Sequence, residues 1–500
     1  MTLPLLLLPL DDRPVNLAFP QLLAEVAGER LLAPPPALLG RFLQPGNPSG
    51  LADWLRQSAA EARAAVVSLD MLAYGGLVAS RTPVLSAEEA LRHLSVLREM
   101  KAQYPALRLY AFNVIMRLTI TGADPETRAA GRDIFRYSVL RDEAERLGDA
   151  SAAVELAAVE ARIPPRLLAA YLAARARNHA VNRAALQLLD EGVLDFLALV
   201  QEDTAPAGLH VAEQQALLAQ AETIDPARWR VYPGTDEAAM TLLARYLLAE
   251  TGLTVPVATH LRDAQAAETP ALFEDLPLRE VVRRHLDAVG ATADAAGLPL
   301  AVQTFTPPQP DLFEMSALPA PTWAAALAAY PRSAVAPWLA ALGSPLAVAD
   351  VAYCNGGDPH LLDALLDAGR FWELESYAGW NTAGNTLGTT CAHMVLHALA
   401  RARGVTPAMA AAHERALCVR LLDDGLYQPV VRAWAMQRAE EIGASPLNLE
   451  KDAAQVEAWV NAAMHALWDE LSARYPHLPT RPFRAELPWG RLFEVNIAFP

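Results

Sequence analysis

Lysine is almost absent from this chain of 500 residues, where Lys101 and Lys451 are the only lysines among 41 basic residues. A phosphate-binding P-loop needs a lysine after its glycines, and imine chemistry needs a buried lysine. Lys101 lies in an ordinary amphipathic stretch and Lys451 near the polar start of a late helix. The sequence therefore argues against both chemistries.

Cysteine is also scarce, with Cys354, Cys391 and Cys418 unevenly spaced and no CxxC motif. This pattern excludes a disulfide framework and argues against a thiolate zinc site. The 11 histidines never form HxH or HExxH, so a metal held by imidazoles is not expected either. We predict no cofactor and no metal site, although carboxylates alone can still bind Mg²⁺ or Ca²⁺.

Positive charge is in deficit, because 41 basic residues face 57 acidic ones and leave a net charge of −16. This balance argues against binding to nucleic acid or to an anionic membrane. No apolar run reaches the ~18–20 residues of a membrane span. The apolar start ends at Asp11 without a basic segment or a cleavage site, which indicates a buried strand and not a signal peptide. We therefore expect a soluble, cytoplasmic protein.

Short apolar runs are abundant, and between them lie helical patterns such as 87–100 and 167–190. This alternation predicts an α/β fold with a mainly parallel sheet. A (β/α)8 barrel or a variant of it is the leading expectation, and a pair of doubly wound domains is the alternative. No internal repeat is visible. The predicted strands cover residues 5–10, 65–69, 109–116, 196–200, 229–232, 254–258, 300–305, 346–353 and 371–377.

Two regions interrupt this alternation. Residues of about 118–194 form a predicted helical insertion, and residues 391–500 form a helical C-terminal region that we expect to pack on the barrel. We assign residues 1–390 to the barrel-like catalytic domain. The C-terminal helices are candidates for a lid, a second domain or a homodimer interface.

Polar clusters follow the predicted strands, at the edge where parallel α/β folds build their sites. Asp70 ends the second strand, and Glu202 and Asp203 follow the fourth. Two adjacent acids cannot both ionise easily, so one of the two has a raised pKa and can donate a proton. We select these three as candidate catalytic residues. The alternative is that the adjacent acids only cap a helix.

Other strand ends supply candidate substrate-binding residues. Trp380 and Tyr377 can stack on a sugar ring, and Arg13 can bind an anion with two parallel hydrogen bonds. Alternatively, Arg117 pairs with a nearby acid, and the PGTDE segment at 233–237 only starts a helix with Thr235 or Asp236 as its cap. The full set is Asp11, Asp12, Arg13, Tyr74, Asn113, Arg117, Asn355, Asp358, Tyr377, Trp380, Asn381 and Asn385.

The helical insertion contains an unusual polar run in which Arg175, Asn178, His179 and Asn182 share one helix face. A solvated face more often uses Glu, Gln and Ala. The run therefore indicates a helix that presents polar groups to the site or to a partner.

Several motifs together resemble a bacterial family that is described only as domain of unknown function four-one-two-seven. The resemblance spans nearly the whole chain and implies where the site lies, but it implies no activity. The family's strand-four motif is Asp-Asp where this chain has Glu202-Asp203, so both charges remain and one side chain is longer. The motifs are PLDDRPVN at 9–16, LDMLAYGGLVASR at 69–81, NVIMR at 113–117, RNHAVN at 177–182, PGTDE at 233–237, NGGDP at 355–359, GWNTAGNTLG at 379–388 and RLFEV at 491–495.

The first functional hypothesis is a glycoside hydrolase that acts on a polar carbohydrate. The adjacent acids are similar to those of substrate-assisted N-acetylhexosaminidases, in which Glu202 would orient the acetamido group and Asp203 would be the acid, or the reverse. Ordinary two-carboxylate hydrolysis would instead pair Asp203 with Asp70 or Asp358. Two alternatives are a non-catalytic binding protein for a polar metabolite, and a metal-dependent isomerase or lyase built on Asp11, Asp12, Asp70 and Glu202.

Overall fold

The computed structural model describes residues 3–122, 124–332, 334–479 and 482–500. Residue contacts divide the chain into two compact units. Unit 1 contains Met1–Ala24, Glu29–Tyr246 and Phe273–Leu276. Unit 2 contains Glu25–Gly28, Leu247–Leu272 and Pro277–Pro500.

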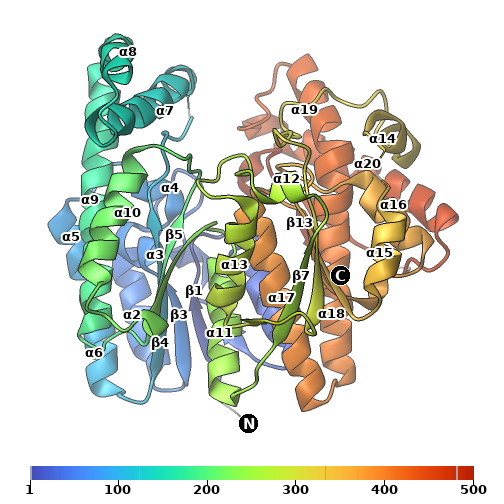
Figure 1. The fold of residues 1–500 in the computed structure, drawn as a ribbon, viewed down its shortest axis with the longest axis horizontal. Helices are drawn as coiled ribbons and strands as arrows, with labels where there is room; N and C mark the ends of the chain where they lie inside the picture. Colours follow the sequence, from blue (N-terminus) through green and yellow to red (C-terminus); the bar gives the residue numbers. More distant parts are fainter. Residues whose placement is uncertain (1–2, 123, 333, 480–481) are drawn as a thin grey trace. The chain divides into compact units, whose positions relative to one another are not determined.

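Unit 1 is built on one parallel sheet, of which Figure 1 labels β1, β3, β4 and β5. Its strands lie in the order β2-β1-β3-β4-β5-β6. The strands are β1 (Leu5–Leu8), β2 (Leu31–Leu32), β3 (Ala64–Ser68), β4 (Arg108–Ile115), β5 (Phe196–Gln201) and β6 (Trp229–Pro233). The helices are α1 (Ala18–Val26), η1 (Pro36–Leu38), α2 (Pro48–Ala59), α3 (Leu69–Tyr74), α4 (Leu77–Ser80), α5 (Ala87–His93), α6 (Ser95–Gln103), α7 (Pro125–Glu145), α8 (Ala150–Glu160), α9 (Pro165–Asp190), α10 (Leu209–Ala221), η2 (Pro226–Arg228) and α11 (Ala238–Thr251).

Helices cover both faces of this sheet, as the alternation of side chains along β4 shows. Leu109 and Ala111 join the core that α2, α6 and α9 build on one face. Tyr110 points to the other face, where its ring stacks on Phe196 and meets the edge of Tyr246 from α11. Strands buried on both faces read as continuous apolar runs, which is why the sequence reveals them.

Unit 2 repeats this architecture with a parallel sheet in the order β11-β10-β9-β7-β8. The strands are β7 (Pro256–Leu261), β8 (Thr292–Ala293), β9 (Leu298–Gln303), β10 (Leu346–Asp350) and β11 (Leu374–Ala378), and the antiparallel pair β12 (Arg484–Glu486) and β13 (Asn496–Ala498) stands apart from this sheet. The helices are α12 (Ala264–Ala267), α13 (Leu278–Val289), α14 (Trp323–Ala329), α15 (Ala336–Leu342), α16 (Pro359–Asp367), η3 (Phe371–Glu373), α17 (Ala383–Arg403), α18 (Pro407–Arg420), the π-helix η4 (Leu421–Val431), α19 (Arg432–Glu441), η5 (Glu450–Asp452), α20 (Ala453–Arg474) and η6 (Pro488–Gly490).

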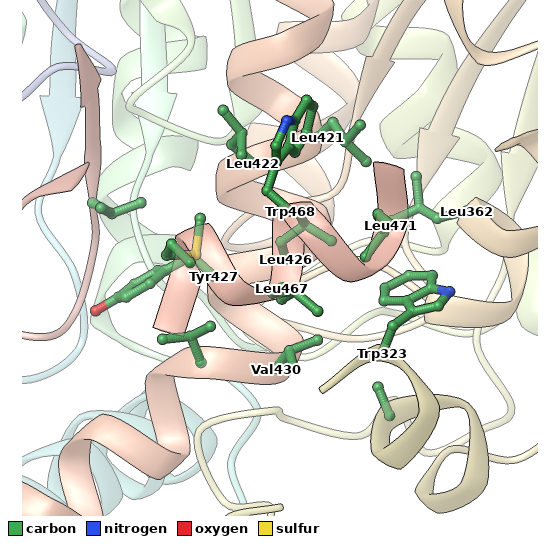
Figure 2. Packing of buried hydrophobic residues seen from close by; sticks show 14 of the residues in the cluster. Trp323, Leu362, Leu421, Leu422, Leu426, Tyr427, Val430, Leu467, Trp468 and Leu471 are labelled. Atoms are coloured by element: carbon green, nitrogen blue, oxygen red, sulfur yellow. The ribbon is translucent and has the colours of Figure 1, made fainter. Parts of the chain in front are cut away.

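The core of unit 2 lies between its sheet and the C-terminal helices. Figure 2 shows Trp323 of α14 and Leu362 of α16 packed near leucines of η4 and α20, among them Leu426 and Leu467. All four side chains are 1% exposed or less. The helices from α18 to α20 therefore belong to the core of unit 2. The expected boundary at residue 390 falls inside α17.

All nine predicted strands and the helical insertion are confirmed. The (β/α)8 barrel is not confirmed, because the described strands form two separate parallel sheets and neither closes. A barrel needs its first and last strands to pair, whereas β2 and β6 each have one strand neighbour in the described part of unit 1. The order of both sheets corresponds to the alternative of two doubly wound domains.

Candidate active site

In unit 1 the chain leaves β1 toward β2 on one side of the sheet and later returns to β3 on the other side. Such a switch point opens a crevice at the carboxyl ends of the strands, and ligands of doubly wound sheets bind there. The loop after β1 carries Asp11, Arg13 and Asn16, and the segment after β3 carries Asp70. The sequence therefore places four polar side chains at the switch point.

Arg13 joins two carboxylates that are far apart in the sequence. Its Nε donates to Asp11 at 2.9 Å, and its two Nη atoms donate to both oxygens of Asp236 at 3.2 and 2.6 Å. Asn16 bridges the same two acids with hydrogen bonds of 2.8 and 3.2 Å. Asp236 thus does more than cap a helix. Asp12, next to Asp11 in the sequence, is half-buried.

Asp70 is a buried carboxyl with amide donors on one oxygen only. Its Oδ2 accepts from Asn113 Nδ2 and from the backbone N–H of Val114, both at 2.9 Å. Its Oδ1 has no hydrogen-bond partner in the described ranges. Burial raises the pKa of Asp70 to about 7, and the negative charge of Glu202 adds to the rise, while the two hydrogen bonds oppose it.

The polar run of α9 points inward and supports these groups. Asn182 Nδ2 donates to Asn113 Oδ1 at 2.6 Å, which leaves the amide nitrogen of Asn113 to face Asp70. Arg177 and Asn178 both donate to the backbone carbonyl of Ser80, the last residue of α4, and Arg177 also donates to that of Thr82. The guanidinium of Arg177 also lies over the ring of Tyr74 at 4.3 Å. The run therefore holds the loops of the site in place.

Glu202 and Asp203 meet two arginines from neighbouring loops. Glu202 pairs with Arg81 and lies 3.6 Å from Arg117, whose other Nη is 3.0 Å from Asp203. Asp203 has a φ of 39°, a left-handed conformation that turns its side chain away from the strand direction. The side chain of Glu202 is 10% exposed and that of Asp203 is 28% exposed. The two acids therefore differ in access to solvent.

Electrostatics connect these groups into one cluster. Burial raises the pKa of Glu202, Arg81 and Arg117 oppose that rise, and the charges of Asp203 and Asp236 add to it. The expected pKa rise in one of the two adjacent acids is thus present at Glu202. Burial likewise raises the pKa of Tyr74 well above its ordinary value.

Buried polar atoms without partners gather in this cluster. Among the buried polar atoms that lack a hydrogen-bond partner in the described ranges are Asn16 Oδ1, Asp70 Oδ1, Arg81 Nε, Arg117 Nε and Glu202 Oε2 of this cluster. Buried polar groups in folded proteins are nearly always bonded to protein, to water or to a ligand. The arrangement therefore suits a bound polar molecule.

The remaining predicted site residues lie in unit 2. Tyr377 is fully buried, and its hydroxyl donates to Asp350 Oδ2 at 3.2 Å. The same oxygen accepts the backbone N–H of Asp358 at 2.6 Å, and Gln303 donates to the Asp358 side chain at 2.9 Å. This group is closely packed, because a Cβ on Gly357 would come within 2.3 Å of the Tyr377 hydroxyl.

The loops after β10 and β11 hold the other predicted amides. The backbone N–H of Asn355 donates to the carbonyl of Asn381 at 2.9 Å, and both residues have a positive φ, of 65° and 64°. Trp380 is 4% exposed and meets the edge of Phe493 at 6.3 Å. Asn385 lies buried in the first turn of α17.

Sequence reasoning missed four charged residues that the structure brings to the strand ends, namely Arg81, Asp236, Asp350 and Asp424. Arg81 and Asp236 find their partners only through the fold. Asp350 ends the observed strand β10, but the strand predicted over 346–353 extended past it, so its position at a strand end was hidden. Burial raises the pKa of Asp424 to about 7, against the opposing charge of Arg420.

In the described ranges no group of three or more His, Cys, Asp or Glu side chains is arranged to hold a metal ion. Among the helices of the same ranges, none combines the length and the apolar character that crossing a membrane requires.

A family model described as "Protein of unknown function (DUF4127)" matches residues 5–498. The chain therefore belongs to this family, as its motifs predicted. No curated protein matches the chain.

Proposed function

We propose that this member of the family is an enzyme that hydrolyses a glycosidic bond of a polar carbohydrate, with its chemistry at the carboxyl ends of β1, β3, β4 and β5. One observation carries the proposal. Asp70 and Glu202 are two buried, electrostatically coupled carboxyls whose partners differ, since Asp70 has amide donors and Glu202 has arginines. When the surroundings of two such carboxyls differ, their pKa values differ, so that one carries a proton and the other is ionised.

Asp70 is the proposed proton donor. Its Oδ2 accepts two N–H groups, so the proton belongs on Oδ1, the oxygen without a partner in the described ranges. With its pKa raised to about 7 by burial, the side chain is protonated in a large fraction of molecules at neutral pH. Asp70 thus takes the role of the acid, for which the sequence suggested Asp203 or Glu202.

Glu202 and Asp203 are the proposed ionised partners. Arg81 and Arg117 stabilise the charge of Glu202, which can then stabilise the positive charge that develops on the sugar in glycoside hydrolysis. Asp203 is more exposed and pairs with Arg117, a position suited to orient a polar group of the substrate, such as an acetamido group.

The alternatives draw less support. Against a protein that only binds a metabolite stands the unpartnered Asp70 Oδ1, an oxygen on which a proton can be carried beside the arginine-bound Glu202. The metal-dependent hypothesis requires a ligand group that the described residues do not form around Asp11, Asp70 and Glu202.

The test is hydrolysis of a panel of nitrophenyl glycosides, including N-acetylated ones, by wild type, Asp70→Asn and Glu202→Gln. We expect each variant to lose about 10²–10⁴-fold in kcat, the usual contribution of a general acid or its partner. Wild-type activity should decrease above about pH 7, as Asp70 loses its proton. Asp190→Asn, an exposed site at the end of α9, is the matched control.

Wild type that turns over no member of the panel, yet is stabilised against heat by a sugar, would identify a binding protein instead. An Asp70→Asn variant with near wild-type kcat would remove Asp70 from the mechanism.

A further inference from the structure

The loops after β9, β10 and β11 of unit 2 surround a buried arginine outside the predicted site. Arg432 begins α19, directly after the π-helix η4, and is 1% exposed. Its Nη1 donates to Gln428 of η4, and its guanidinium lies over the ring of Phe313 at 4.6 Å. π-helical turns occur frequently at functional sites, because they re-aim side chains.

Arg432 lacks the carboxylate partner that comparable arginines have. It makes no ion pair within the described residues, and its Nη2 has no hydrogen-bond partner there. By contrast, Arg420 is 4% exposed and pairs with Asp423 and Asp424, and Arg13 is 5% exposed and pairs with two acids.

The acids nearest to Arg432 are engaged elsewhere. Asp311 accepts the backbone N–H of Phe313 at 2.8 Å and the side chain of Asn355 at 2.9 Å. Asp423 bonds to Arg420 and Gln428, and Glu494 pairs with Arg491. Burial lowers the pKa of Arg432, and the charges of Tyr427 and Asp311 oppose that effect. A buried charge without a partner is costly, so an anion from outside the chain would relieve it.

The surroundings of Arg432 suit a small molecule with a ring. Phe313 and Phe493 are half-buried, and their ring centroids are 5.5 Å apart. Phe493 also contacts Trp380. Trp380 Nε1 and Asn355 Oδ1 are both buried and have no hydrogen-bond partner in the described ranges. The loop of Asn355 packs on η4, where a Cβ on Gly356 would come within 2.9 Å of Gln428 Cβ.

We propose that unit 2 binds a sugar acid, whose carboxylate accepts from Arg432 Nη2 and whose ring lies beside Phe313 and Phe493. Trp380 Nε1 and Asn355 Oδ1 then bind its hydroxyl groups. A monoanion fits better than a phosphate dianion, because the charges of Asp311 and Asp423 already act on the Arg432 guanidinium. The proposal does not depend on hydrolysis at Asp70.

The test measures binding to the full chain by calorimetry and by thermal unfolding, with D-glucuronate, D-glucose 6-phosphate and D-glucose as probes. We expect saturable binding of glucuronate and no stabilisation by glucose. Arg432→Met should weaken glucuronate binding at least tenfold, and Trp380→Phe should weaken it several-fold. Arg438→Met, an exposed arginine on the same helix, is the matched control and should bind as wild type does.

Unliganded Arg432→Met supplies the second measurement. Removing a buried charge that has no partner should leave the melting temperature unchanged or raise it. A lower melting temperature, together with no stabilisation of wild type by glucuronate, would show that Arg432 is a structural cation and overturn the proposal. Tighter binding of the phosphate than of glucuronate would overturn the choice of a sugar acid.

Discussion

Units 1 and 2 share the strand order 2-1-3-4-5, counted along each unit, but their strand ends carry different chemistry. In unit 1 the third strand is followed by Asp70 and the fifth by Glu202 and Asp203. In unit 2 the third strand ends in Gln303, and the fifth is followed by Gly379 and Trp380. The same backbone plan therefore supports two kinds of site.

Both units use arginines and neutral donors for their buried acids, but at different places. In unit 1, arginines pair with acids that follow strands, as Asp236 with Arg13 and Glu202 with Arg81. In unit 2, Asp350 at the end of β10 receives a backbone N–H and the hydroxyl of Tyr377, and Arg420 pairs with acids of η4. The strand ends of the two units therefore differ in how many ion pairs they carry.

The largest expected effect concerns the arginines of the two units. Arg13→Met leaves two buried carboxylates without their cation, so we expect it to lower the free energy of unfolding by about 3–5 kcal/mol. Arg432→Met should change the free energy of unfolding little, because it leaves no carboxylate without its cation. Chemical denaturation measures both variants, with Arg56→Met on an exposed pair as the control. Equal losses in the free energy of unfolding for Arg13→Met and Arg432→Met would show that the two arginines have the same role.

The second effect concerns pH. Because burial raises the pKa of Asp70 from 3.8 to about 7, the native state holds this proton more tightly than the unfolded chain. Its contribution to stability is complete below pH 3.8 and decreases as pH rises to about 7, by about 4 kcal/mol in all. Asp70→Asn lacks this dependence, so its stability relative to wild type should increase between pH 4 and pH 8. Denaturation at several pH values measures the difference, and a flat difference would refute the raised pKa.

The smallest effect concerns packing in unit 2. A Cβ at Gly357 would lie 2.3 Å from the Tyr377 hydroxyl and 3.0 Å from Asp350, so Gly357→Ala should cost about 1–3 kcal/mol. Gly131→Ala in α7 of unit 1 has room, with its nearest atom at 3.4 Å, and should be neutral or slightly stabilising. Thermal unfolding compares the two, and a neutral Gly357→Ala would show that this acid group is not closely packed.

Apolar runs were sufficient to predict the nine main strands, because strands covered on both faces need continuous apolar residues. They could not predict which strands pair, so the barrel was preferred over two doubly wound domains, whereas β6 and β7 lie in separate sheets. The two-residue strands β2 and β8 are too short to leave a pattern.

The residues of the candidate site were likewise only partly predictable from the sequence. Asp70, Glu202 and Asp203 were predictable because each follows a strand. Asp236 was not, because its partner Arg13 is 223 positions away and only the fold brings them together. The sequence did not indicate a functional role for Arg432, because an arginine in a helical region resembles a surface residue until its burial is known.

The helical insertion has a consequence for engineering. Its first two helices, α7 and α8, form a small core with the start of α9, separate from the core of the sheet. The second half of α9 packs in the sheet core, and its Asn182 fixes the amide of Asn113. A shortened chain could therefore replace α7 and α8 with a linker. A truncation that also removes α9 would leave the amide of Asn113, which donates to Asp70, without the residue that orients it.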